Sequence, residues 1–212
     1  MTNIQIPNEF SENIKKKYEI YEFRHAGTIF KNDFPEEYGQ LIELLENFLV
    51  TYEDIQTPGG GKSPIATKFD KALYGNGWQE KKWDISIRID GKDNPSPTHN
   101  VDYYKNNVAV ELEWNNKDPF FDRDLNNFRL LHQLGVISVG VFVTRADELQ
   151  QLFNKLGKGQ SYGASTTHVS KLLPKIIGGG AAECPILVFA ITKNACLEKV
   201  KEVLEEVKKK SS

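Results

Sequence analysis

Three acidic residues, Asp102, Glu111 and Glu113, have the type and spacing to carry out chemistry. Residues 108–114, VAVELEW, alternate between apolar and other side chains, which predicts a β-strand with one buried face. Glu111 and Glu113 then share the other face, where they repel each other unless a proton or a cation lies between them. Asp102 precedes Glu111 by nine residues, and the Lys-Asn-Asn connection between them could turn the chain back. Three carboxylates converging on one point would make an oxygen-rich site for a divalent cation such as Mg2+.

A second interpretation is that the two glutamates simply face water, as alternating acids on a strand often do. Three features favour the metal site. No Lys or Arg stands beside the acids on that face, Asp102 lies at hairpin distance, and the polar segment 115–119 leads straight into a helix.

The length and composition limit the class of protein. A chain of 212 residues can form one α/β domain with a substantial core, and we expect a single domain over residues 1–212. The net charge of -2 argues against a generally basic nucleic-acid-binding surface, although a local basic concavity remains compatible with it. The sequence has no apolar run near the roughly 20 residues that span a bilayer and no secretory signal at its start. Its two cysteines, Cys184 and Cys196, lack the spacing of metal ligands and are expected to be thiols in a reducing compartment, which indicates a cytoplasmic protein.

The elements that would position the acids follow a β-α-β-α order. The strand at 108–114 precedes a helix that begins at Asp118-Pro119 and ends at Gly135, and an apolar strand at 136–144 precedes a helix at 145–156. This order predicts an α/β fold with a central mixed sheet flanked by helices. The remaining predictions are helices at 11–18, 33–50, 64–74, 167–176 and 195–210, strands at 18–30, 83–89 and 185–191, and a turn cluster at 90–97.

The segment 57–64, TPGGGKSP, contains the letters of a phosphate-binding loop without its spacing. A nucleotide-binding loop needs Gly five residues before Gly61, where the chain has Gln56, so we expect no nucleotide cofactor. Ser63 suits an N-cap and Pro64 the first helical position. The amides of that helix start, together with Lys62 and Ser63, could hold a DNA phosphate. A plain flexible loop is the alternative.

The pattern of Asp102 followed by Glu-x-Glu on an apolar strand resembles the PD-(D/E)xK nuclease core, with Glu113 where Lys is usual. It is most similar to the BglII/BstYI family of restriction endonucleases, which is BamHI-like. BamHI also has Glu at this position, whereas BglII and BstYI have Gln. The resemblance extends in order through an aromatic-basic opening after residue 18, the GGGKS loop, Gly77-Trp78, the helix after Trp114, a Ser161-Tyr162 loop and a Pro-led strand at 185.

The resemblance implies a type II enzyme of a restriction-modification system, a homodimer that needs Mg2+ and cuts palindromic double-stranded DNA around a GATC-type core. Asp102 and Glu111 would hold one or two Mg2+ ions, joined by the backbone carbonyl of Leu112. Glu113 would position or deprotonate the attacking water, and since it lacks the charge of a Lys, the identity of the general base stays open.

The loop at 157–167 is the expected reader of DNA bases. Its glycines allow a close approach to a groove, and its hydroxyls and cation can bond base edges. In the resembled family the equivalent Ser-Tyr loop contacts bases. The candidates are Lys158, Ser161, Tyr162, Ser165 and Thr166. The alternative is that Ser161 and Thr166 only form turns and cap the next helix.

Two other functions remain open from the sequence. One is a nuclease of the same core that recognises DNA structure, as a repair enzyme does. The other is a non-catalytic DNA-binding or regulatory protein whose acids are solvated, and a test for metal-dependent nicking separates it from both nucleases.

Overall fold

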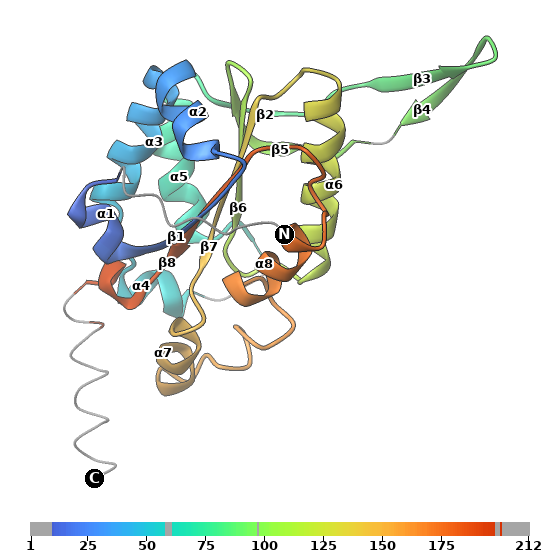
Figure 1. Ribbon diagram of the computed structural model, residues 1–212. Helices are drawn as coiled ribbons and strands as arrows, with labels where there is room; N and C mark the ends of the chain where they lie inside the picture. The colour runs from blue at the N-terminus through green and yellow to red at the C-terminus, as the bar shows by residue number, and fades with distance from the viewer. Residues whose placement is uncertain (1–9, 58–60, 97, 198–199, 201–212) are drawn as a thin grey trace.

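The core of the protein is a six-stranded mixed sheet, seen in a computed structural model that describes residues 10–57, 61–96, 98–197 and 200 (Figure 1). The strand order is β1-β8-β7-β6-β5-β2, in which β6, β7 and β8 run parallel and the other pairs antiparallel. The predicted α/β fold is confirmed. The bounds are β1 (Tyr18–Phe23), β2 (Gln79–Lys81), β5 (Val101–Lys105), β6 (Val108–Glu113), β7 (Val139–Arg145) and β8 (Ile186–Ile191).

Helices cover both faces of this sheet (Figure 1). One face packs against α1 (Glu12–Lys17), α2 (Ala26–Asp33), α3 (Pro35–Asn47), α5 (Pro64–Tyr74) and α7 (Leu149–Lys155). The other face packs against α6 (Pro119–Gln133) and α8 (Val169–Ile177). Every residue of β6 is therefore buried, Glu111 and Glu113 included. The prediction of a strand with one solvated face was wrong, and so was the interpretation that the glutamates face water.

The connection between β5 and β6 is a tight hairpin. Asn106 and Asn107 have φ angles of 43° and 65°, the left-handed conformation that two-residue hairpin turns need and that Asn tolerates well. Tyr103 pairs with Val110 across the hairpin, so the next position back along β5 brings Asp102 beside Glu111. The predicted turn and its consequence for Asp102 are confirmed.

The predicted strand at 18–30 was wrong beyond Phe23. Arg24 and His25 both have left-handed φ angles, 57° and 58°, which end β1 and start α2 at once. The buried carboxylate of Glu22 accepts a hydrogen bond from the amide of Gly27 at 2.7 Å and holds this turn. The helix α2 then extends to Asp33. Asp33 was expected to cap the following helix, but the N-cap of α3 is Phe34.

The predicted turn cluster at 90–97 contains a strand. Asp90 and Gly91, with φ angles of 48° and 77°, form the turn of a second hairpin between β3 (Ile85–Ile89) and β4 (Lys92–Ser96). This two-stranded sheet extends away from the body of the protein (Figure 1). Ile87 and Ile89 are exposed along it. The alternation of apolar and polar residues over 83–89 therefore predicted the strand correctly, but these apolar side chains are not buried in the core.

Further elements differ from expectation or lie outside the described residues. The strand β7 continues through Arg145, so the predicted helix at 145–156 begins only at Leu149. The helix α4 (Tyr52–Gln56) was not predicted, although Thr51 and Asp54 form a capping box at its start. The predicted terminal helix at 195–210 lies outside the described residues beyond its first few positions, and Lys193–Ala195 is a 3-10 turn. None of the described helices is long and apolar enough to cross a membrane.

Candidate active site

Asp102 and Glu111 face each other across the β5–β6 hairpin and are tied to each other's backbone. The amide of Asp102 donates to Glu111 Oε2 at 3.3 Å, and the amide of Leu112 donates to Asp102 Oδ2 at 3.0 Å. Glu113 lies two residues beyond Glu111 on the same buried face of β6, and each glutamate exposes 1% of its surface. The hairpin thus brings the three predicted acids into one buried region.

A fourth acid, Asp124 of α6, joins this region and was missed by the sequence analysis. Its side chain is fully buried, and its Oδ1 accepts a hydrogen bond from Arg123 Nε at 2.7 Å. Asp124 occupies a helical position that apolar Phe121, Leu125 and Phe128 define as the buried face of α6. An acid in such an apolar stripe is the sequence signal that could have identified it.

The acids hold protons tightly because they are buried together. Burial first, and then the charges of Asp124 and the other acids, raise the pKa of Glu113 to about 9 and that of Glu111 well above its usual value. The pKa values of Asp102 and Asp124 are also raised, chiefly by burial. Carboxylates that are this costly to ionise in one place favour a shared proton or a bound cation.

The expected convergence of three carboxylates on one point is not present. Among the described residues, no group of three or more His, Cys, Asp or Glu side chains is arranged so that it could hold a metal ion. The reason is that Asp102 Oδ2 turns to the Leu112 amide and Glu111 Oε2 to the Asp102 amide.

The chemistry of the donor set nevertheless fits a hard divalent cation. Glu111 Oε1, Glu113 Oε2 and Asp124 Oδ2 are buried without any hydrogen-bond partner. Such oxygens are costly to bury unpaired, and they have the ligand type that Mg2+ prefers.

A pocket of about 380 Å³ lies next to this region, and Asp102 is the acid of the group that lines it. Its walls join Asp102 and Leu112 to the start of α5 at Lys62 and Ser63, segments far apart in the sequence. Ser63 caps α5, because its hydroxyl accepts a hydrogen bond from the Ala66 amide at 3.1 Å, as predicted. Lys62 forms an ion pair with Asp70, which partly neutralises the positive charge that Lys62 brings to the pocket wall.

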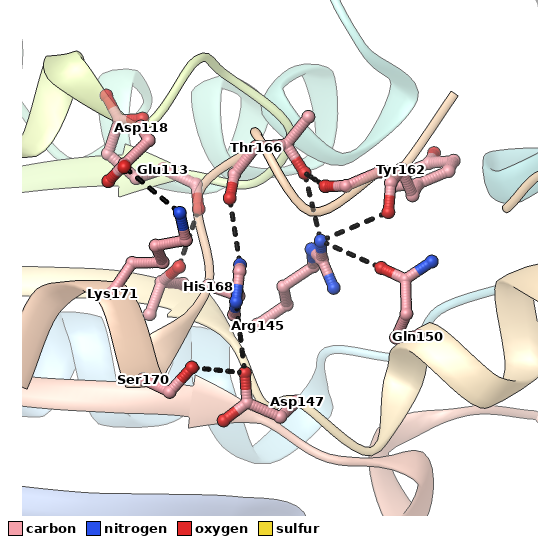
Figure 2. A network of polar contacts seen from close by, with 12 residues as sticks. Glu113, Asp118, Arg145, Asp147, Gln150, Tyr162, Thr166, His168, Ser170 and Lys171 are labelled. Carbon is pink, nitrogen blue, oxygen red and sulfur yellow. Dashed lines mark hydrogen bonds and ion pairs between the residues drawn. The ribbon is translucent and has the colours of Figure 1, made fainter. Parts of the chain in front are cut away.

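The loop at 157–167 is anchored beside the same region by Arg145, the last residue of β7 (Figure 2). Arg145 is fully buried, and its Nη2 donates to Thr166 Oγ1 at 2.9 Å, Gln150 Oε1 at 3.3 Å and the Tyr162 carbonyl at 3.4 Å. The backbone of Thr166 also forms an antiparallel β-bridge with that of Lys117, which connects the loop to the segment that follows Glu113. The loop and the acids are therefore parts of one connected structure.

The five loop candidates have different surroundings. Ser161 and Ser165 are exposed, whereas Lys158 Nζ donates to the Gln56 carbonyl at 2.9 Å. Tyr162 is buried, and its ring stacks on Phe153 with 4.0 Å between centroids. Tyr162 thus supports the loop from beneath, whereas the two serines are exposed on its outer side.

The six-stranded mixed sheet flanked by helices is consistent with the restriction-endonuclease-like fold. The chain belongs to the BglII/BglIII restriction endonuclease family, whose sequence profile matches residues 18–191. That stretch contains Asp102, Glu111 and Glu113 together with both candidate DNA-binding loops. The protein is accordingly a DNA-binding hydrolase whose partner is double-stranded DNA, of a kind that generally uses a divalent metal. A search of curated proteins finds no match.

Proposed function

We propose that this protein is a type II restriction endonuclease, which hydrolyses phosphodiester bonds at a palindromic site in double-stranded DNA and depends on Mg2+. The site has a GATC-type core, and the whole chain acts as one nuclease domain in a cytoplasmic restriction-modification system. The observation that carries the proposal is a group of buried acids with unpaired oxygens, next to an Asp102 that lines a pocket, in a chain of a restriction endonuclease family.

Each acid has a separate role in the proposed reaction. Asp102 and Glu111 would hold the divalent ion, together with the carbonyl oxygen of Leu112, which follows Glu111 on β6. When bound, the ion polarises the phosphate and lowers the pKa of water. Asp102 is suited to this role because it lines the pocket, where a phosphate can approach.

Glu113 would orient the attacking water and take its proton. Its raised pKa, about 9 without a cation, means that Glu113 holds a proton at neutral pH. A bound cation would displace that proton and leave a carboxylate that can accept one from water. Its carboxyl group interacts with the buried carboxyl group of Asp124, and a water molecule that reaches Oε2 could donate a hydrogen bond to it.

DNA would be held by the two loops. Lys62 and Ser63 border the pocket, where the first amides of α5 can bind a phosphate oxygen. The base-reading contacts would come from the outer side of the loop at 157–167, from Ser161 and Ser165, with Lys158, Tyr162 and Thr166 holding its shape.

A homodimer would match the two-fold symmetry of a palindrome, with one active site for each strand. Sedimentation of the free protein and of its DNA complex measures this directly. A monomer on DNA that makes single-strand nicks would contradict it.

The decisive experiment is digestion of a plasmid of known sequence with Mg2+, with Ca2+ and with EDTA, followed by mapping of the ends. We expect discrete ends at one short palindrome with Mg2+ and no cleavage with EDTA. Cleavage only at flaps or junctions would indicate a structure-specific nuclease instead. Binding of DNA without nicking in any divalent metal would indicate a non-catalytic protein.

A further inference from the structure

A positive charge reaches the buried acids from α6, outside the strand that carries the glutamates. Arg123 Nη2 lies 3.8 Å from Glu113 Oε1, and Arg123 Nε lies 2.7 Å from Asp124 Oδ1. The guanidinium also lies over the Phe120 ring, 4.3 Å from its centroid. These contacts fix the position of a long side chain that remains 30% exposed.

Arg123 is the cation that forms ion pairs with these acids. Within the described part of the chain, Arg123 is the only ion-pair partner of Asp102, Glu111, Glu113 and Asp124. The nuclease pattern that the chain resembles has a Lys at the third strand position, and this chain has Glu113 there. The strand therefore adds a negative charge where that pattern places a positive one, and an uncompensated group of buried acids is costly.

We propose that Arg123 is a positioning residue that supplies the positive charge absent from β6, held in place by Asp124 and acting through Glu113. The guanidinium engages Glu113 Oε1 and leaves Oε2, which has no hydrogen-bond partner, available to a metal ion or a water molecule. This inference rests on the proposed nuclease function, because it assigns Arg123 a task in the same site.

The proposal predicts that one substitution, the removal of Arg123, changes metal affinity and cleavage rate in opposite directions. Arg123 and a divalent cation are attracted to the same carboxylates, so removal of Arg123 should strengthen metal binding. The same removal should slow cleavage, since Glu113 loses the contact that orients it. A residue with only a structural role would weaken both properties or neither.

The test is calorimetric titration of Mn2+ into wild type, Arg123→Gln and Arg123→Lys, alongside plasmid cleavage and thermal melting. We expect Arg123→Gln to bind Mn2+ about tenfold more tightly and to cut at least about tenfold more slowly. Arg123→Lys keeps the charge, so its Mn2+ affinity should stay within about threefold of wild type. Its cleavage rate should fall between those of wild type and Arg123→Gln, because an ammonium group cannot reproduce the two contacts of the guanidinium. Arg129→Gln is the matched control on the exposed side of α6, where Arg129 contacts only Asn126 and Gln133 in the hydrogen bonds of the described residues, and it should change neither property.

Unchanged or weaker Mn2+ binding by Arg123→Gln would overturn the proposal. Should that variant fail to fold, Asp124→Asn decides, because it releases Arg123 and removes one negative charge. We expect weaker Mn2+ binding and slower cleavage from it, and wild-type behaviour would also overturn the proposal. If the wild-type protein cuts no DNA, the proposed function fails, whereas the calorimetric comparison still judges the role of Arg123.

Discussion

Asp102 and Glu111 are bound to each other across a two-residue turn, with the amide of Asp102 donating to Glu111 Oε2 at 3.3 Å. The return bond, from the Leu112 amide to Asp102 Oδ2, is 3.0 Å long. Two acids nine residues apart in the sequence are thereby held side by side, with Glu111 buried and Asp102 at the wall of the pocket.

The first prediction concerns these two acids. Asp102→Asn or Glu111→Gln should lower the cleavage rate at least about a hundredfold, because each removes a charge that would hold the ion. Binding of DNA in Ca2+, measured by gel shift, should persist. A variant of either residue that cuts at the wild-type rate would contradict the proposed role of that residue in holding the ion.

The second prediction concerns the stability of the metal-free protein. The pKa of Glu113 rises on folding from its usual 4.5 to about 9, and that of Glu111 rises as well. The folded state therefore binds more protons than the unfolded state within this window, so stability falls as pH rises from about 4.5 through 9. In EDTA, the melting temperature should be higher at pH 6 than at pH 9, and the difference should shrink in Glu113→Gln. An equal pH dependence in both proteins would contradict the raised pKa of Glu113.

The third prediction concerns the charge of the third acid. Glu113→Lys should lose most of the activity, although it restores the commoner nuclease motif. The new cation would lie next to Arg123 and would compete for the oxygens of Glu111. Single-turnover cleavage measures the loss, and full activity would show that the side chain at this position only fills space.

The fourth prediction separates base reading from phosphate binding. Ser161→Ala should reduce cleavage of the cognate site far more than non-specific binding, since a good base contact contributes roughly 1–3 kcal/mol of discrimination. Lys62→Ala should weaken binding to all DNA about equally and flatten its salt dependence. Competition binding at several salt concentrations distinguishes the two. Reduced thermal stability with unchanged site preference in Ser161→Ala would show that the loop is structural.

The fifth prediction concerns the buried guanidinium of Arg145. Its Nε and Nη1 are buried without a hydrogen-bond partner, which is costly. Arg145→Met should therefore lower the free energy of unfolding by less than about 1 kcal/mol, or raise it. The loop should nevertheless loosen, because Thr166 and the Tyr162 carbonyl lose their anchor. Amide hydrogen exchange should accelerate in residues 162–167, with Arg129→Met as the control. Unchanged exchange there would mean that other contacts hold the loop.

The sequence by itself determined the local features of this protein. The alternation at 108–114 identified the strand, Asn106-Asn107 permitted the tight turn, and the register of that hairpin placed Asp102 beside Glu111. These features depend on residues close in the chain, so periodicity and turn chemistry were sufficient to predict them. Ser63 at the start of α5 followed from the same kind of local rule.

Only the tertiary structure decided what surrounds the acids. The strand pattern indicated a solvated face, but α6 covers it and buries both Glu111 and Glu113. The same packing brings Asp124 and Arg123 to the acids and places the loop of Thr166 beside Lys117. These contacts join residues from different elements. The charges of Glu111, Glu113 and Asp124 interact strongly because these acids are buried together, beside Arg123, and no local pattern in the sequence encodes that.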